Sequence, residues 1–263
     1  MFYSCQKVIR EANVHPYSNC GILICPVGDS TSGLRIASSM LNTIVDKTTV
    51  LFLSGGKTPK ELYQDIAKEG KFHPGAVGLV DERYAKGPMH KESNEKMLAD
   101  TGFLSHCKYT SIPVHLQLRN GISSEETARS YDEEVRTLFA TYSKHIAILG
   151  VGLDGHTAGI HATSSLSLQG EALESWVKDL RTRSKNRMVI DYSDKGGFYK
   201  ERITMTFLAL SMMDLLLVLV FGREKKHALD LLFSDGSEEE VPARFLKRPD
   251  IANKTILITD QTI

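Results

Sequence analysis

The sequence has little that would direct it to a membrane, to nucleic acid or to secretion. Lysine plus arginine equals aspartate plus glutamate, 32 against 32 in 263 residues, so the net charge does not favour binding to polyanions in general. The longest apolar run, residues 215–221, is far shorter than the ~20 residues that a membrane-spanning helix needs. Residues 1–13 contain no long apolar core, so we expect no secretory signal there.

Cysteine is scarce, and its spacing is typical of neither a disulfide framework nor a metal site. The four cysteines are Cys5, Cys20, Cys25 and Cys107. None forms a C-x-x-C pair, which favours reduced thiols.

No internal repeat or low-complexity linker divides the chain, and its length suits one large α/β domain. We therefore predict one cytoplasmic domain over residues 1–263, a monomer or small homo-oligomer, with no nucleic-acid or membrane partner.

Segments typical of strands and of helices alternate along nearly the whole chain. This alternation predicts an α/β fold with a mostly parallel sheet and helices on both faces. Strands are expected at residues 21–25, 49–53, 76–80, 109–113, 145–149, 187–190, 215–221 and 255–259. The longer helices are expected at residues 31–45, 59–66, 124–142, 171–180 and 223–233. Residues 1–19 and 194–197 are expected to be irregular.

A glycine-rich turn follows the second predicted strand. Residues 54–59 read SGGKTP, with Thr58 as the expected helix N-cap and Pro59 at the first helical position. Free backbone N–H groups and the dipole at a helix N-terminus form a site for anions, and Lys57 is placed to add a cation. The alternative interpretation is a tight strand-to-helix turn that binds nothing.

Three charged residues, Asp81, Glu82 and Arg83, follow the strand predicted at residues 76–80. Charges at the end of a buried strand are costly unless they pair or face a polar cleft. One interpretation is a structural ion pair from Arg83 to Asp81 or Glu82. The other is a cluster that faces a substrate, and the position at the end of a strand favours it.

The densest group of unusual residues follows the strand predicted at residues 145–149. Residues 149–159 read LGVGLDGHTAG and place Asp154 and His156 where open α/β sheets bind ligands. The alternative is a plain turn with Asp154 as a helix N-cap and His156 on the surface. The glycine spacing also matches a dinucleotide fingerprint, but the continuation is atypical and no ribose-binding acid follows.

A lysine lies near the start of the helix predicted at residues 223–233. Lys225 is in the first turn, where the helix dipole disfavours a cation. This placement indicates an anion nearby, and an ordinary surface lysine is the alternative.

Taken in order, these segments resemble the 6-phosphogluconolactonases. The resemblance spans residues 50–250 and rests on SGGKTP (54–59), DER (81–83) with Ser93 and Asn94, GVGLDGHTA (150–158), RITMT (202–206), Gly222 with Lys225, and PARFL (242–246). The wider superfamily also contains glucosamine-6-phosphate deaminases. It implies a Rossmann-like fold that binds a phosphosugar at the strand ends.

Two positions separate the lactonase branch from the deaminase branch. Deaminases usually have Asp-Glu-Tyr at residues 81–83, and a glutamate where this chain has His161. Both departures favour the lactonase. Lactonases, however, usually continue Ala-Ser-Leu-Phe-Pro-Gly where residues 158–163 read AGIHAT, and they have serine or threonine in place of Lys57. The substrate preference can therefore differ from the family norm.

The resemblance implies hydrolysis of 6-phospho-D-glucono-1,5-lactone to 6-phosphogluconate, in the oxidative pentose phosphate pathway. A lactone is an activated ester, so the reaction needs no metal or cofactor in principle. We expect His156 to be the base, since a neutral imidazole accepts a proton near neutral pH. Asp154 or Asp81 would orient it or bind sugar hydroxyls.

The other candidate residues would bind negative charge. The oxyanion is expected at the backbone N–H groups of Gly55 and Gly56, or at Arg83. The phosphate is expected at Arg202 and Lys225, with Lys57 as a third cation. Ser54 and Thr58 complete the first loop as binding candidates. His161 is expected to be a packed surface histidine rather than a second polar group in the pocket.

Two other functions stay open. An aminosugar deaminase or isomerase would release ammonia from glucosamine 6-phosphate. A non-catalytic phosphosugar-binding protein would bind 6-phosphogluconate without turning over the lactone.

Overall fold

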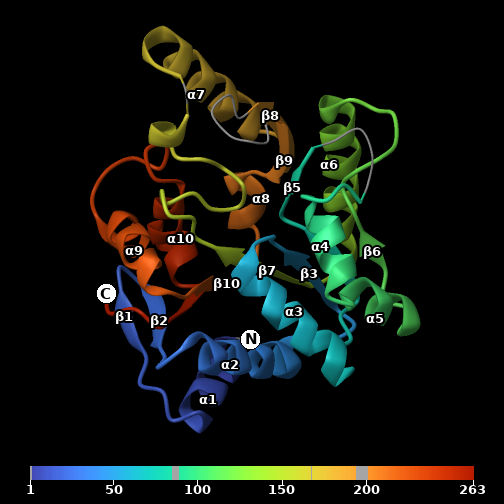
Figure 1. Cartoon of the computed structure of the whole chain (residues 1–263), viewed down its shortest axis with the longest axis vertical. Coiled ribbons are helices and arrows are strands. Elements are labelled where there is room, and N and C mark those ends of the chain that lie inside the picture. The colour runs from blue at the N-terminus through green and yellow to red at the C-terminus, as the bar shows by residue number, and fades with distance from the viewer. Residues whose placement is uncertain (1, 85–88, 167, 194–200) are drawn as a thin grey trace.

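The computed structural model describes residues 2–84, 89–166, 168–193 and 201–263, and they form a central sheet with helices on both faces (Figure 1). The α-helices are α1 (Phe2–Glu11), α2 (Ser30–Ile44), α3 (Lys57–Glu69), α4 (Asn94–Asp100), α5 (Phe103–Tyr109), α6 (Ser124–Thr141), α7 (Gly170–Ser184), α8 (Phe207–Ser211), α9 (Lys226–Phe233) and α10 (Pro249–Ala252). Short 3₁₀ helices are η1 (Thr163–Ser165), η2 (Arg223–Lys225) and η3 (Pro242–Lys247). Within these ranges, no helix has the length and apolarity to span a membrane.

The strands of the central sheet are β1 (Tyr17–Asn19), β2 (Ile22–Pro26), β3 (Thr49–Leu53), β4 (Ala76–Leu79), β6 (Val114–His115), β7 (Lys144–Gly150), β10 (Leu215–Val220) and β11 (Thr255–Thr259). Their order is β1-β2-β11-β10-β7-β3-β4-β6, and all neighbours are parallel except β1 and β2. The predicted α/β class and mostly parallel sheet are confirmed. From β3 the chain proceeds to β4 on one side, and from β7 to β10 on the other. The adjacent carboxyl ends of β3 and β7 therefore form a topological switch point, where open α/β sheets bind ligands.

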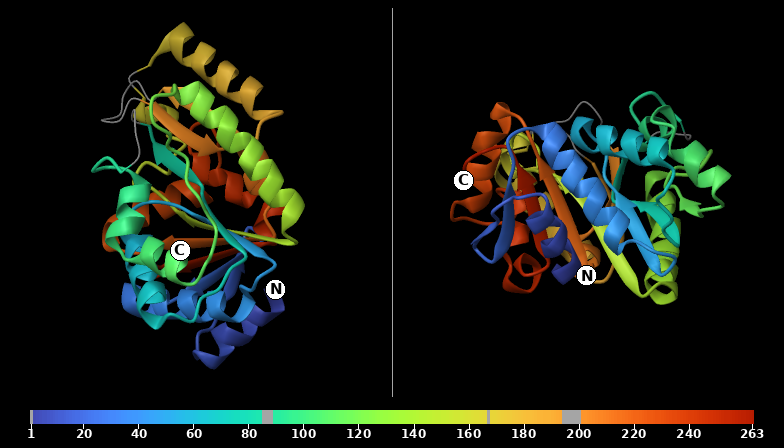
Figure 2. Two further views of the ribbon diagram at one scale, coloured as in Figure 1. Left: turned by 90° about the vertical axis from the view of Figure 1, so that its right-hand side faces the viewer. Right: turned by 90° about the horizontal axis from the view of Figure 1, so that it is seen from below.

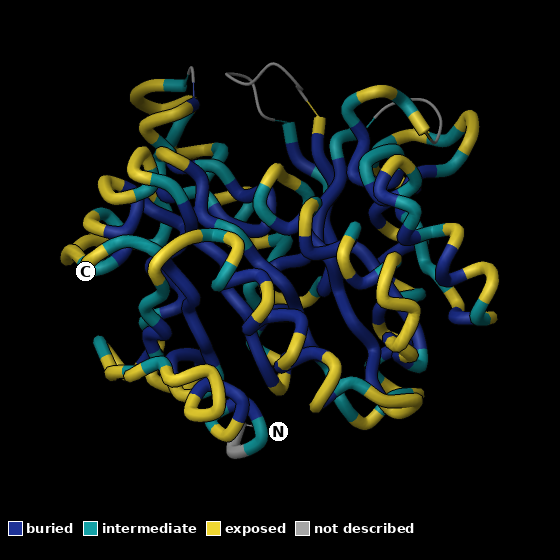
Figure 3. Tube along the Cα trace, turned by 60° about the horizontal axis from the view of Figure 1, so that its bottom comes forward, coloured by how far each residue is buried: buried dark blue, intermediate teal, exposed yellow. Residues whose placement is uncertain are grey.

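The core lies on both faces of this sheet. In β3, Val50 and Phe52 pack with α6, α8 and α9, whereas Leu51 and Leu53 pack with α1, α2 and α3. Successive side chains of a strand point to opposite faces, so a strand buried on both faces is apolar throughout. Figure 3 shows the buried strands in the middle of the molecule and the exposed segments around them.

A second sheet was not predicted from the sequence. Three strands, β5 (Asp81–Arg83), β9 (Glu201–Met205) and β8 (Val189–Ser193), pair antiparallel in the order β5-β9-β8. Helix α6 packs against β8 and β9, and Figure 2 shows α6 and α7 beside this small sheet. The strand predicted at residues 76–80 thus ends at Leu79, and the charged triplet begins a strand of the other sheet.

Two expectations for other segments were wrong. Residues 1–19 are not irregular, because α1 buries Cys5, Val8 and Ile9 at helical spacing against α2. Residues 109–113 are not a strand, because Tyr109 ends α5 with 91% of its surface exposed. The strand in this region is the short β6. The loop expected at residues 194–197 lies outside the described residues.

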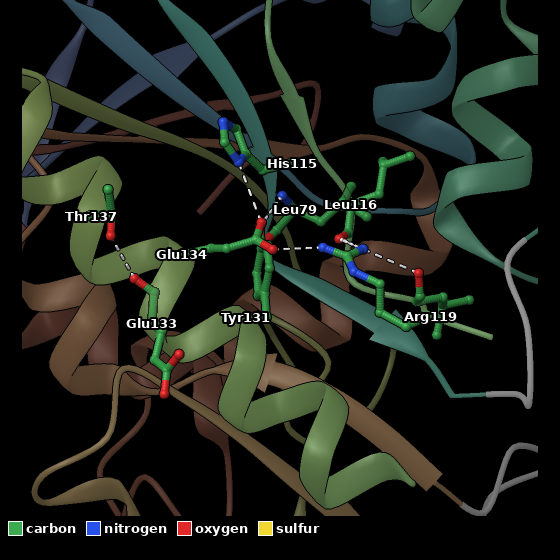
Figure 4. Close-up of polar contacts among 9 residues, drawn as sticks. Leu79, His115, Leu116, Arg119, Tyr131, Glu133, Glu134 and Thr137 are labelled. Atoms are coloured by element: carbon green, nitrogen blue, oxygen red, sulfur yellow. Dashed lines mark hydrogen bonds and ion pairs between the residues drawn. The ribbon is translucent and has the colours of Figure 1, made fainter. Parts of the chain in front are cut away.

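Helix α6 is fixed to the edge of the central sheet by buried and partly buried polar contacts (Figure 4). The Tyr131 hydroxyl accepts a hydrogen bond from Leu79 N at 2.6 Å and donates to Leu79 O at 2.9 Å. Glu134 contacts His115 Nδ1 at 3.3 Å and Arg119 Nη2 at 2.6 Å. Leu79 is the last residue of β4, so these contacts hold the backbone that leads directly to Asp81.

Candidate active site

A cavity of about 690 Å³ lies at the carboxyl ends of β3, β7 and β10. It occupies the switch point of the central sheet and is also bordered by the small sheet. All candidate residues from the sequence line it: Ser54, Gly55, Gly56, Lys57, Thr58, Asp81, Arg83, Asp154, His156, Arg202 and Lys225. The structure therefore brings together side chains from five separate segments of the chain.

The loop between β3 and α3, residues 54–56, presents the N-terminus of α3 to this cavity. The helix begins at Lys57 with Gly56 as its N-cap, at φ 114, and no side chain caps it. The expectation that Thr58 is the N-cap was wrong, because the glycine's positive φ turns the chain into the helix earlier. Ser54 is 5% exposed, and its Oγ has no hydrogen-bond partner among the described residues. The loop thus offers a hydroxyl and uncapped N–H groups to a ligand.

Asn94 connects this loop to the charged triplet. A Cβ at Gly55 would lie 1.8 Å from Asn94 Oδ1, so the loop packs directly on the Asn94 amide. The amide Nδ2 donates to Asp81 O at 2.7 Å, and Oδ1 accepts from Arg83 Nη1 at 2.8 Å. Glu82 is buried and accepts the Asn94 backbone N–H at 2.7 Å, at the start of α4. Among the described residues, no ion pair joins Arg83 to Asp81 or Glu82, and the ion-pair interpretation is wrong for them.

The loop after β7 places an imidazole against a carboxylate. His156 Nδ1 lies 2.6 Å from Asp154 Oδ1, which also accepts the His156 backbone N–H at 3.1 Å. Ser165 donates to Asp154 Oδ2 at 2.5 Å. Since no helix follows Asp154 directly, its interpretation as a helix N-cap was wrong. The His156 side chain is 38% exposed, so it is accessible from the cavity.

The charge of Asp154 determines which nitrogen of His156 carries the proton. Burial opposes its ionisation, but the hydrogen bond and charge of His156 and the bond from Ser165 hold the pKa of Asp154 well below its usual range. An ionised carboxylate has no proton to donate, so His156 Nδ1 must be the donor. The lone pair of the neutral ring is then on Nε2.

Glycine is required where the His156 ring crosses the backbone. A Cβ at Gly152 would lie 2.0 Å from His156 Nδ1. Gly152 N also donates to His156 O at 2.8 Å, which closes the loop on itself. The glycine spacing in the sequence therefore reflects space for the imidazole as well as backbone conformation.

Two cations of the cavity come from separate elements. Arg202 lies on β9 and is paired in register with Arg83 on β5. Lys225 lies in η2, immediately before α9, and its Nζ donates to Val151 O at 2.7 Å. Burial lowers the pKa of Lys225, opposed by the charges of Glu224 and Asp154. The predicted position of a lysine at the start of a helix is confirmed.

Several lining or supporting residues were not on the list of candidates. They include Asn94, Ser165, Glu224 and His161. Asn94 had a signal, since it belongs to the resemblance. Ser165 had none, because a serine eleven residues after an aspartate follows no motif. His161 is not a surface histidine: its side chain is 15% exposed, and its ring stacks on His156 with centroids 4.8 Å apart.

Comparisons with known proteins agree with the fold. The family profile of glucosamine-6-phosphate isomerases/6-phosphogluconolactonase matches residues 32–257. A 6-phosphogluconolactonase from Synechocystis is 29% identical over 74% of this chain and 76% of its own. A glucosamine-6-phosphate deaminase from Oceanobacillus iheyensis is 29% identical over 81% of this chain and 84% of its own. The structure of a 6-phosphogluconolactonase from Plasmodium vivax, 18% identical, covers 97% of this chain and 94% of its own, with a TM-score of 0.72, and shows the same fold.

Proposed function

Since the chain belongs to the glucosamine-6-phosphate isomerase/6-phosphogluconolactonase family, we propose that it hydrolyses 6-phospho-D-glucono-1,5-lactone to 6-phospho-D-gluconate. This reaction is a step of the oxidative pentose phosphate pathway. The observation that carries the proposal is the contact of 2.6 Å between Asp154 and His156, in a cavity that also collects basic side chains. Hydrolysis of a phosphorylated lactone needs both a base and a site for the phosphate.

His156 acts as the general base in this proposal. Its Nε2 takes a proton from a water molecule, which attacks the lactone carbonyl carbon and forms a tetrahedral oxyanion. Collapse of the oxyanion breaks the bond to the ring oxygen, and the imidazolium returns the proton to that oxygen. Asp154 holds the ring in the required tautomer and stabilises its positive charge. No side chain of the protein has to form a covalent bond to the substrate.

Negative charge is stabilised at two places in the cavity. The oxyanion is assigned to the backbone N–H groups of Gly55 and Gly56 or to the guanidinium of Arg83. The phosphate is assigned to Arg202 and Lys225, where a planar fork and a point charge act together. Ser54, Thr58 and Lys57 surround the α3 N-terminus and add donors.

The pairing of Arg83 with Arg202 supports an anionic ligand. These residues lie directly opposite each other on β5 and β9, and both line the cavity. Like charges opposite each other on neighbouring strands are unfavourable. The two guanidinium groups concentrate positive charge at the cavity, which suits a phosphorylated substrate better than a neutral sugar.

The lactonase is favoured over the deaminase by the position of His161. The resemblance implies a glutamate at this position in deaminases, whereas here the imidazole of His161 stacks on His156. One relative, from Oceanobacillus, is named a glucosamine-6-phosphate deaminase. Any assay must therefore also test glucosamine 6-phosphate as a second substrate.

Replacement of the proposed base tests this function. We expect His156→Ala to lower lactone hydrolysis by about 10²- to 10⁴-fold, the usual contribution of a general base. The assay follows acid release from freshly generated lactone above the spontaneous rate, and ammonia release from glucosamine 6-phosphate in parallel. His227→Ala, at an exposed position outside the cavity, is the matched control. Turnover near that of the parent in His156→Ala would remove His156 from the mechanism, and ammonia release without acid release would identify a deaminase.

A further inference from the structure

Asp154 and His156, which the proposed hydrolysis uses, form a cluster of possible metal ligands with His161, which it does not use. Each offers one ligand atom, and these three atoms all lie within 4.8 Å of one another. His156 Nδ1 is 2.6 Å from Asp154 Oδ1, and His161 Nδ1 is 3.9 Å from Asp154 Oδ2. Ligands at the usual zinc distances of 2.0 to 2.2 Å are about 3.3 Å apart in a tetrahedral site. The two observed separations, one to each oxygen of Asp154, lie on either side of this value.

The backbone holds His161 against His156. Residues Thr157 and Ile160 form an antiparallel bridge, and Ile160 N donates to Thr157 O at 2.8 Å. Ala158 and Gly159 have positive φ angles of 51 and 70, so the chain reverses between the two histidines. Thr204 and Tyr192 donate hydrogen bonds to the carbonyls of Ala158 and Gly159. The small sheet therefore fixes this turn, and little rearrangement would bring the three ligand atoms together.

We propose that Asp154, His156 and His161 bind a divalent transition metal such as Zn²⁺, and that the bound metal blocks hydrolysis. Two imidazoles and one carboxylate suit zinc, cobalt or nickel, whereas Mg²⁺ and Ca²⁺ prefer sites made of oxygen ligands. The metal replaces the hydrogen bond from His156 to Asp154. With the metal on Nδ1, the neutral ring of His156 carries its proton on Nε2 and cannot accept one from water, so the same residues cannot hold the metal and perform the reaction.

The charges of the cavity limit which metals bind. Lys57, Arg83, Arg202 and Lys225 line the same space and oppose a cation. Binding must therefore come from direct bonds to nitrogen, which borderline-soft metals form and hard cations do not. The metal site itself does not depend on the proposed function, whereas the expected inhibition does.

The binding test uses the full chain with Cys20→Ser, because Cys20 is an exposed thiol that could bind metal itself. Co²⁺ is titrated by its visible absorption, and Zn²⁺ is then added to displace it. We expect one metal ion per chain in this parent. His161→Phe keeps a ring in place and removes one ligand, and we expect it to weaken binding at least about tenfold, as even outer-shell changes do. His227→Phe, at an exposed position, should bind as the parent does.

Inhibition of lactone hydrolysis by Zn²⁺ is a second, independent measurement on the same variants. The Zn²⁺ concentration that halves lactone hydrolysis, relative to each variant's own metal-free rate, should rise at least about tenfold in His161→Phe. Asp154→Asn provides a second ligand deletion for the Co²⁺ titration, with circular dichroism as the check of folding. Equal metal affinity in the parent and in a folded His161→Phe would overturn the site. Co²⁺ binding that depends on His161 in a protein without lactonase activity would retain the site and reject the proposed function.

Discussion

At the scale of single residues, Asp154 is the side chain that fixes the orientation of His156. Its two oxygens accept hydrogen bonds from the His156 backbone, the His156 ring and Ser165. A base is effective when its ring orientation and tautomer are fixed before the substrate binds. Ser165 acts on the reaction through Asp154 and is a positioning residue.

The role of Ser165 can be separated from substrate binding. We expect Ser165→Ala to lower kcat about tenfold, which corresponds to about 1.4 kcal/mol, and to change KM less than about twofold. The reason is that a bond to a charged group is lost at the carboxylate and no contact with the phosphate changes. Ser164→Ala, next to it in η1 and exposed, is the control. A rise in KM with unchanged kcat would contradict a positioning role.

Lys225 should show the opposite pattern. Its Nζ is held by Val151 O beside the cavity, where it is assigned to the phosphate. We expect Lys225→Ala to raise KM about ten- to a hundredfold, since a hydrogen bond to a charged group contributes about 1.5 to 3 kcal/mol. Steady-state kinetics on the lactone measures this effect. Lys226→Ala is the control, because Lys226 is exposed and pairs with Asp230. An unchanged KM in Lys225→Ala would exclude the phosphate role.

The sequence predicted the residues that face the ligand better than those that support them. Asp154 and His156 follow a glycine pattern that can be recognised, and both line the cavity as expected. The bond from Ser165 to Asp154 depends on how the chain returns after the turn at Gly159, and no local rule specifies that path. The stacking of His161 on His156 depends on the same turn.

At the scale of elements, the starts of α2 and α6 depend on local hydrogen bonds. Asp29 caps α2 by accepting the Ser32 N–H at 2.7 Å, and Ser123 forms a capping box with Glu126 at α6. The small sheet was missed because β5 pairs with β9 across more than a hundred residues. Strand-like composition does not specify the partner strand, and here it did not distinguish the two sheets.

Protonation of Glu82, beside the start of α4, makes the stability of the fold depend on pH. It accepts the backbone N–H groups of Arg83, Asn94 and Glu95, of which the last two are the first N–H groups of α4. Burial raises the pKa of Glu82 to about 8, against those hydrogen bonds. The folded state therefore holds a proton that the unfolded state loses near its ordinary pKa of 4.5. The stabilisation is complete below that pH and is lost as the pH rises to about 8.

This linkage can be measured as a difference between two proteins. The unfolding free energy of the parent should fall with pH by up to about 1.4 kcal/mol per unit, relative to Glu82→Gln, between pH 5 and 8. Glutamine does not titrate, so the variant lacks this slope whatever its own stability is. Urea unfolding at several pH values gives both curves. A difference that stays constant over this range would show that Glu82 is ionised in the folded protein.

At the scale of the whole molecule, the cavity lies where two sheets meet. The loops after β3 and β7 belong to the central sheet, whereas Asp81, Arg83 and Arg202 belong to the small sheet. Lys225 comes from a third segment, after β10. That the chain forms one domain stays a prediction, but segments of both sheets line the same cavity. Binding should therefore stabilise the molecule as a unit rather than one loop.

Thermal unfolding with the product measures this coupling. A ligand at 100 times its Kd stabilises the folded state by about 2.7 kcal/mol. For a chain of about this size, each kcal/mol raises Tm by about 2 to 4 °C, so we expect 6-phosphogluconate to raise Tm by about 5 to 10 °C in one transition. Gluconate without the phosphate should have little effect, because Arg202 and Lys225 then lack their ligand. In Lys225→Ala the shift at the same product concentration should shrink, whereas in Lys226→Ala it should persist. Two separate transitions, of which the product moves only one, would show that the sheets unfold independently and that the cavity does not couple them.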